Sequence, residues 1–193
     1  MSLRTKHYEG QDLSEMYATA RPTLPRAVVD RVLRYLSETI PQSQWSLVLD
    51  VGCGPGVSSS TYLHALPSTV RFIGFDISRS QVEKAKELLQ NEHKNAEFRQ
   101  HNVDDGIPME TNSVDLINVT TAVHWLNSDL FFPEAQRVLR PGGVLALNWY
   151  YDTRVHVTSL SEQQNEHLNA LIKQLLSDLI ELNMWEWDLK AML

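Results

Sequence analysis

Short apolar runs alternate along the chain with segments of helical periodicity, and this alternation constrains the fold more than any other feature. We interpret the apolar runs as strands, because each is bounded by glycine, proline or polar residues. They cover 47–51, 70–75, 96–100, 114–120 and 143–149. Strands that alternate with helices favour a parallel sheet with helices on both faces. The predicted fold class is therefore α/β, with a doubly wound parallel sheet.

Two of the predicted helices begin with the residue pair of a capping box. Ser78 is followed three residues later by Gln81, and Ser161 is followed by Gln164. In this motif the serine oxygen accepts from the backbone N–H three residues on, while the glutamine side chain reaches back to the serine N–H. The predicted helices run from Pro25 to Pro41, from Ser78 through Leu89, over 129–140, and from Ser161 through Ile180.

Composition and charge exclude several classes of function. The 193 residues include 17 basic and 24 acidic side chains, a net charge of −7, whereas a nucleic-acid-binding face needs clustered Lys and Arg. Cys53 is the only cysteine, so we expect neither a disulfide nor a cysteine-based zinc site, and infer a reducing, cytoplasmic compartment. The seven histidines show no metal-ligand spacing. No apolar stretch approaches the roughly 18 residues of a membrane-spanning helix. We therefore expect no metal, no nucleic-acid partner and no membrane span.

A glycine-rich loop follows the first predicted strand. Gly52, Gly54 and Gly56 stand at alternate positions, where the backbone can turn tightly and approach a ligand without a Cβ in the way. The helix predicted to begin near 57–60 would direct free N–H groups and its positive dipole end at the same space. This arrangement suits an anionic or carboxylate-bearing ligand, although a plain strand-to-helix turn has the same pattern.

An acidic residue ends the second predicted strand. Asp76 follows Gly56 by 20 residues and would lie at the tip of the neighbouring strand. A carboxylate in this place can accept both hydroxyl hydrogens of a ribose. Capping of the next helix is the alternative, but Ser78 already fits that role. The loop and Asp76 together indicate a cofactor that contains ribose.

The residues around the loop favour one such cofactor over a dinucleotide. The dinucleotide fingerprint places its third glycine where this chain has Val57, so a nicotinamide-dependent oxidoreductase is disfavoured. Asp50 precedes the loop, where its charge would repel a diphosphate and could pair with an ammonium group. An amino acid joined to a nucleoside meets both conditions, with its ammonium near Asp50 and its ribose on Asp76. S-adenosylmethionine has this structure.

Five motifs in order resemble those of the class I S-adenosylmethionine-dependent methyltransferases, in the small-molecule branch called the type 11 domain. They lie at 48–56, 74–78, 102–108, 114–117 and 139–143. The resemblance implies a Rossmann-like sheet whose strand ends hold S-adenosylmethionine. It assigns cofactor contacts to Tyr17, Arg21, Asp50, Gly52, Cys53, Gly54, Gly56, Asp76, Ile77, Asn102, Val103 and Thr120. Asn102 stands where the family usually has Asp, so its contact would lack charge.

Two further segments, 17–22 and 122–126, are similar to those of trans-aconitate methyltransferases. By this resemblance Arg21 could pair with a carboxylate of the cofactor or of an acidic acceptor. His124 is the candidate catalytic residue, since it could orient or deprotonate the acceptor, and a structural histidine is the alternative. Trp125 would pack a wall of the pocket, or belong to the ordinary core.

The C-terminal part departs from the family pattern. The family sheet usually ends in an antiparallel strand pair, but we predict no such pair after Tyr151, where an amphipathic helix follows. We therefore expect an N-terminal lid and helix over 1–44, a cofactor-binding core over 45–150 and a helical tail over 151–193. The predicted function is methyl transfer to a small-molecule acceptor, which could be a carboxylate. The alternative is a truncated isoform with weak or no activity that acts through a protein partner.

Overall fold

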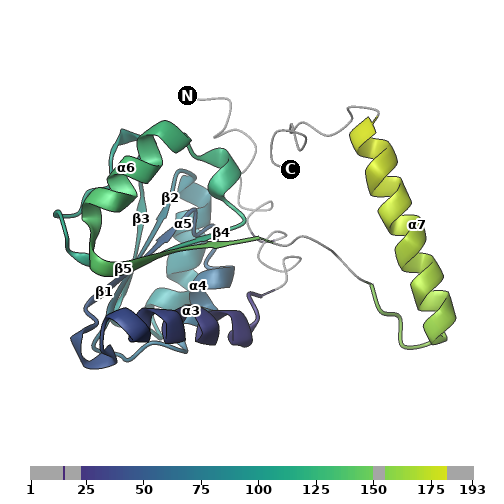
Figure 1. Cartoon of the computed structure of the whole chain (residues 1–193), viewed down its shortest axis with the longest axis horizontal. Helices are drawn as coiled ribbons and strands as arrows, with labels where there is room; N and C mark the ends of the chain where they lie inside the picture. The colour runs from purple at the N-terminus through teal and green to yellow at the C-terminus, as the bar shows by residue number, and fades with distance from the viewer. Residues whose placement is uncertain (1–14, 16–22, 150–154, 182–193) are drawn as a thin grey trace. The chain divides into compact units, whose positions relative to one another are not determined.

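The computed structural model describes residue 15 and residues 23–149 and 155–181. The chain divides into two compact units, residues 1–149 and residues 150–193, and Figure 1 draws both. The first unit contains the sheet and the second contains one long helix. Each unit is described by itself.

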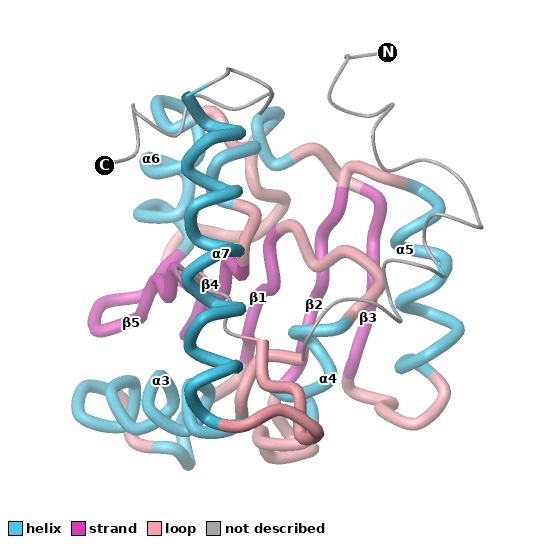
Figure 2. The backbone as a smooth tube through the Cα atoms, turned by 90° about the vertical axis from the view of Figure 1, so that its right-hand side faces the viewer, coloured by secondary structure: helices cyan, strands magenta, loops and turns pink. Residues whose placement is uncertain are grey.

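Five parallel strands form the sheet of the first unit. They are β1 (Leu47–Val51), β2 (Arg71–Asp76), β3 (Ala96–Gln100), β4 (Val114–Thr120) and β5 (Leu139–Asn148). Their spatial order is β3-β2-β1-β4-β5, and Figure 2 shows them side by side. The chain thus builds outward from β1 to β3 and then returns to the other side of β1. Such a reversal opens a crevice at the carboxyl ends of the central strands. The predicted α/β, Rossmann-like fold class is confirmed.

Helices cover both faces of this sheet because successive strand residues point to opposite sides. On one face of the sheet, a hydrophobic core shared with three helices contains Val48, Phe72 and Leu116. On the other face, a second core shared with one helix contains Leu49 and Ile73. The three helices are α3 (Arg26–Thr39), α4 (Val57–Leu63) and α5 (Arg79–Ala85), and the one on the other face is α6 (Ser128–Val138). A π-helical turn over Lys86–Gln90 extends α5. All strand residues of β1 and β4 are buried, as expected for a central parallel pair.

The start of β5 differs from the prediction. The helix expected over 129–140 ends at Val138, and the strand begins at Leu139 rather than at residue 143. Leu139 pairs with Val114, and the next pair is Val144 with Leu116, so four residues of β5 lie opposite one residue of β4. The Pro-Gly-Gly sequence therefore forms an irregularity inside the ladder, where Gly142 has a positive φ of 83°.

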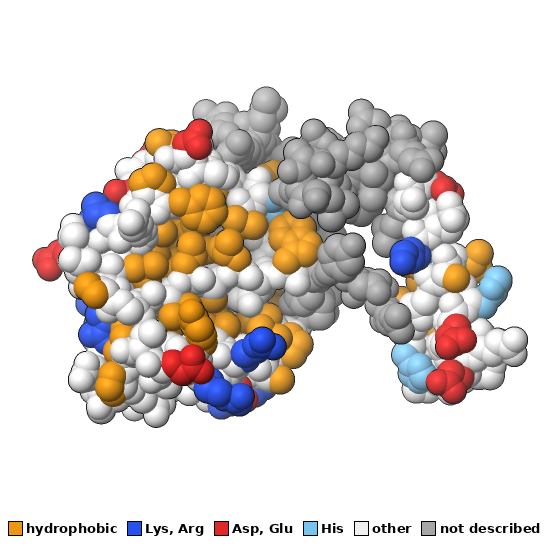
Figure 3. Space-filling model, in the orientation of Figure 1, with side chains coloured by type: hydrophobic (Ala, Val, Ile, Leu, Met, Phe, Trp, Pro, Cys, Tyr) orange, Lys and Arg blue, Asp and Glu red, His pale blue; other side chains and the backbone are white. Residues whose placement is uncertain are grey.

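β5 is the last strand of the sheet, and no described residue pairs with its outer edge. Leu147 on this strand is 48% exposed, and Trp149, directly after the strand, is 45% exposed. Leu130 and Phe132 of α6 are also exposed. Figure 3 shows hydrophobic side chains gathered on this face of the first unit.

The second unit contains α7 (Glu162–Glu181), which confirms the helix predicted after Ser161. Both bonds of its capping box form, since Gln164 N donates to Ser161 Oγ at 3.3 Å and Ser161 N donates to Gln164 Oε1 at 2.9 Å. Residues 155–181 contain no strand. The prediction about a strand pair also concerns residues 182–193, which lie outside the described part of the chain.

Candidate functional site

A cavity of about 220 Å³ lies at the carboxyl ends of β1, β2 and β4. Seven of the predicted cofactor residues line it: Gly52, Gly54, Asp76, Ile77, Asn102, Val103 and Thr120. Asp50, Cys53, Gly56 and His124 are not in its lining, and Tyr17 and Arg21 lie outside the described residues. The topological switch point therefore brings together residues from three of the five predicted motifs, together with Thr120 at the end of β4.

The glycine loop adopts a backbone that favours glycine at all three positions. The φ angles of Gly52, Gly54 and Gly56 are 69°, 55° and 90°. A Cβ on Gly52 would overlap that of Ala122, and one on Gly56 would lie 2.5 Å from Leu89 Cδ1. Packing within the chain thus requires two of the glycines, besides any requirement of a ligand.

Asp76 joins the loop to the start of α5. Its Oδ2 accepts from Gly54 N at 2.8 Å, and its Oδ1 accepts from Ser78 N at 2.9 Å. A carboxylate oxygen can accept more than one hydrogen bond, so these contacts are compatible with hydroxyl donors. Asp76 is therefore held in place by backbone N–H groups of the loop and of the start of α5, and it lines the cavity.

Asp50 is completely buried beside the cavity, with hydrogen bonds to side chains from two elements. It accepts from Ser59 Oγ at 2.5 Å, from Ser58 Oγ at 3.3 Å and from Asn118 Nδ2 at 2.6 Å. Burial raises the pKa of Asp50 to about 6, although these hydrogen bonds act in the opposite direction. Asn118 also bonds Thr120, which lines the cavity. The contact of Asp50 with an ammonium group stays a prediction.

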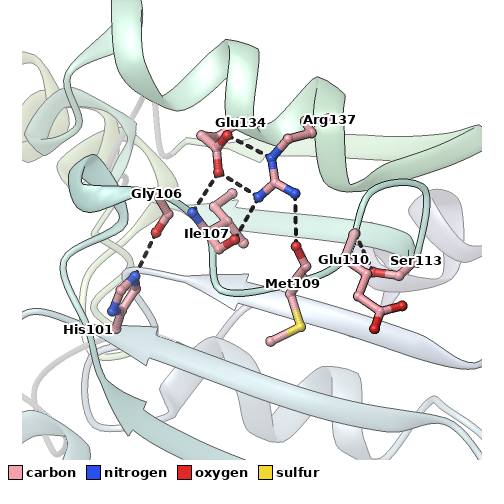
Figure 4. A network of polar contacts seen from close by, with 8 residues as sticks. All are labelled: His101, Gly106, Ile107, Met109, Glu110, Ser113, Glu134 and Arg137. Atoms are coloured by element: carbon pink, nitrogen blue, oxygen red, sulfur yellow. Dashed lines mark hydrogen bonds and ion pairs between the residues drawn. The ribbon is translucent and has the colours of Figure 1, made fainter.

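The segment 101–110 forms a second wall, and α6 holds it in place (Figure 4). Glu134 accepts from Ile107 N at 2.9 Å, and Arg137 donates to the carbonyl oxygens of Ile107 and Met109 at 2.8 and 2.9 Å. Arg137 also bonds Glu134, and mainly for this reason the pKa of Glu134 falls to about 2. His101 contacts Gly106 O at 2.6 Å through Nε2. These contacts fix the loop on which Asn102 and Val103 reach the cavity.

The third wall follows β4 and contains a strained residue. Thr121 lines the cavity with a φ of 52°, a conformation that β-branched residues rarely adopt. Its backbone N–H donates to Asn148 O at 2.8 Å, which ties this conformation to β5. Ala122, Trp125 and Leu126 then supply an apolar surface to the same cavity.

His124 lies in the 3₁₀ turn Val123–Trp125, which Ala122 separates from the strained Thr121. Its ring centroid is 5.1 Å from that of Trp125 and 4.8 Å from that of Trp149, the latter edge-on. Trp125 lines the cavity and His124 does not. The catalytic role of His124 stays a prediction.

Comparisons with known proteins agree with this geometry. A family model described as a methyltransferase domain matches residues 48–143. A trans-aconitate 2-methyltransferase of Azoarcus sp. is 33% identical over 118 residues, which cover 61% of this chain and 44% of that protein. The chain belongs to the class I S-adenosylmethionine-dependent methyltransferases.

Further relatives extend the comparison. A methyltransferase of Claviceps purpurea is 30% identical over 134 residues, which cover 67% of this chain and 39% of that protein. A solved structure from Anaeromyxobacter dehalogenans, assigned as a type II methyltransferase, is 32% identical with a TM-score of 0.55, covering 71% of this chain and 52% of that one. The chain spans about half the length of the curated relatives it matches, or less.

S-adenosylmethionine is the cofactor that this family and fold imply, and the residues that line the cavity fit it. Asp76 offers acceptors for two ribose hydroxyls, and Asn102 offers an uncharged amide beside the apolar Ile77 and Val103. The glycines of the loop remove side chains from the space beside β1. The described residues of the chain contain no group of three metal-ligating side chains and no helix with the length and hydropathy of a membrane span.

Sequence reasoning missed three residues of this site. Gln81 was assigned to a helix cap, yet it lines the cavity, as do His101 and Thr121. The available signal is that Gln81 lies in the first turn of the helix that follows Asp76. No pattern in the sequence indicated the left-handed backbone at Thr121, because its side chain disfavours that conformation.

Proposed function

We propose that this chain binds S-adenosylmethionine in the cavity and transfers its methyl group to a small-molecule acceptor. The observation that carries the proposal is the convergence of the Asp76 carboxylate, the glycine loop and the segment with Asn102 on one cavity at the switch point. When bound, the cofactor supplies a methyl group on a positively charged sulfur and leaves as a neutral thioether. The chain's own residues would bind the cofactor, orient the acceptor and exclude water from the site.

Each wall has a distinct part in this work. Asp76 would accept the ribose hydroxyls, and Asn102 and Val103 would border the adenine. Ala122, Trp125 and Leu126 would keep water from the reacting groups, since alignment in a dry site supplies much of the rate of such a transfer. His124 would orient the acceptor, and would take its proton where the acceptor is a hydroxyl.

A carboxylate acceptor is the finer part of the proposal. The relative from Azoarcus sp. is named for trans-aconitate, a carboxylic acid. A carboxylate is already ionised near neutral pH, so it can attack the methyl carbon without a general base. Arg21, which lies outside the described residues, would supply the pairing cation. The comparisons give no support to the alternative of a weakly active isoform.

Calorimetric titration with S-adenosylhomocysteine tests the cofactor site. The wild-type chain should bind it, and Asp76→Ala should weaken binding by about 2–3 kcal/mol, roughly 30- to 150-fold, because charge-assisted hydrogen bonds are lost. Asp105→Ala is the matched control, since Asp105 is exposed and not in the cavity lining. Equal affinities of wild type and Asp76→Ala would place the cofactor elsewhere.

A second assay tests the acceptor. Radiolabelled S-adenosylmethionine is supplied with a set of small di- and tricarboxylic acids and with their amides. Label should enter the acids and not the amides. Transfer to the amides alone would contradict the carboxylate proposal while leaving the cofactor site intact.

A further inference from the structure

Gln81 carries a buried amide that forms no hydrogen bond with the described part of the chain. Its side chain lines the cavity, and the residue is only 2% exposed. Neither Nε2 nor Oε1 has a hydrogen-bond partner among the described residues. Burying an amide without partners costs free energy, so such a group is uncommon unless a ligand satisfies it.

The start of α5 explains why this amide is available. Gln81 N donates to Ser78 Oγ at 3.4 Å, so the first half of the capping box forms. The second half does not, because Ser78 N donates to Asp76 Oδ1 instead. The same residue pair on α7 forms both bonds, as Ser161 and Gln164 show. Asp76 therefore displaces the Gln81 side chain from its usual partner.

We propose that Gln81 recognises the adenine ring of the cofactor through paired hydrogen bonds. This inference rests on the proposed function, since it requires S-adenosylmethionine in the cavity. A primary amide presents a donor and an acceptor side by side, and the N6 amino group and N7 of adenine present the complementary pair. One ligand edge would thus satisfy both Nε2 and Oε1.

The neighbouring residues agree with this place for the ring. Ile77, Asn102 and Val103 line the same cavity, and two of them are apolar and suit the faces of a purine. Asp76 is the residue proposed to hold the ribose, so the amide of Gln81 would meet another polar edge of the nucleoside. Gln81 is accordingly a specificity-determining residue of the cofactor site.

The test combines one variant with one altered ligand. Binding of S-adenosylhomocysteine and of its 7-deaza analogue, which lacks the N7 acceptor, is measured by calorimetry on wild type, on Gln81→Met and on Gln164→Met. Wild type should bind the 7-deaza analogue about tenfold more weakly than the parent compound. Gln81→Met should bind the parent about tenfold more weakly and should not distinguish the two ligands. Gln164→Met, the matched control on α7, should behave as wild type.

Thermal unfolding without ligand separates recognition from a structural role. Gln81→Met should melt at the same temperature as wild type or higher, because it removes an unsatisfied buried amide. A lower melting temperature together with unchanged affinity would make Gln81 a structural residue and overturn the inference.

The remaining outcomes are also decisive. If wild type binds both ligands equally, the paired contact with adenine is wrong even if no variant folds. If Gln81→Met keeps the preference for the parent ligand, another group reads N7 and the inference fails, while the proposed cofactor binding stands. If wild type binds neither ligand, the proposed function fails and the inference fails with it.

Discussion

Alanine in place of Gly52 tests whether packing within the chain, and not only a ligand, fixes the glycine loop. Two costs apply to Gly52→Ala. The φ of 69° costs an L-residue about 1–2 kcal/mol. The new Cβ would lie well inside 3.0 Å of Ala122 Cβ, and overpacking a dense site costs about 1–3 kcal/mol. Alanine also makes the unfolded chain stiffer than glycine does, which offsets up to about 1 kcal/mol of these costs. The free energy of unfolding should therefore fall by about 2–4 kcal/mol.

Removal of the opposing methyl group separates the two costs. Ala122→Gly alone should lower the free energy of unfolding by about 1–2 kcal/mol, because a buried methyl is lost and the chain gains flexibility. In the double variant the collision is absent, so its loss of free energy of unfolding should be about 1–3 kcal/mol smaller than the sum of the two single losses. Urea unfolding followed by circular dichroism measures all four proteins. Strict additivity of the two single changes, within about 0.5 kcal/mol, would refute the packing argument.

Three further predictions concern residues near the cavity. Thr121→Gly should raise the free energy of unfolding by about 1 kcal/mol, because relief of the left-handed strain exceeds the flexibility of glycine, and a urea titration that shows lower stability would contradict this. Burial raises the pKa of Asp50 in the folded chain to about 6, above the ordinary value of 3.8, so its contribution to stability is present below pH 3.8 and is lost as pH rises through 6. Between pH 4 and pH 8, Asp50→Asn should therefore gain on wild type by about 2 kcal/mol in urea unfolding, and a constant difference would count against the raised pKa. Glu134 has a lowered pKa of about 2, so the stability it contributes is present above pH 4.5 and is lost as pH falls toward 2. In Glu134→Gln, the free energy of unfolding should therefore fall less steeply between pH 4.5 and pH 2 than in wild type. An unchanged pH dependence in urea unfolding would contradict the assignment.

The sheet could be predicted from sequence because its strands are apolar and are separated by helical periods. β3 and β4 have the bounds that the apolar runs indicate. The prediction for the start of β5 was wrong because Pro141 and Gly142 are typical of a turn. In the structure they form an irregularity within the strand, after Leu139 has already paired with β4.

The candidate site was predictable at the strand ends and not between elements. Asp76 and the glycine loop follow strands directly, so their place at the crevice follows from topology. Whether the Gln81 side chain caps its helix depends on which acceptor reaches Ser78 N. The same Ser and Gln spacing occurs twice, but Ser78 N donates to Asp76 whereas Ser161 N donates to Gln164. Competition of this kind is decided by distances that a pattern does not contain.

The polar contacts of Asn118 have a consequence for how the strands are aligned. Asn118 lies opposite Asp50 of β1 in the sheet and bonds its carboxylate, and it accepts from Asn148 of β5 at 2.7 Å. A shift of either neighbour by one residue would turn these groups to the other face and leave buried polar atoms without partners. Apolar side chains of similar size penalise such a slip far less, because they can exchange places. Three side chains at the carboxyl ends thus select a single register for β1, β4 and β5, and with it the relative height of the loops that form the cavity.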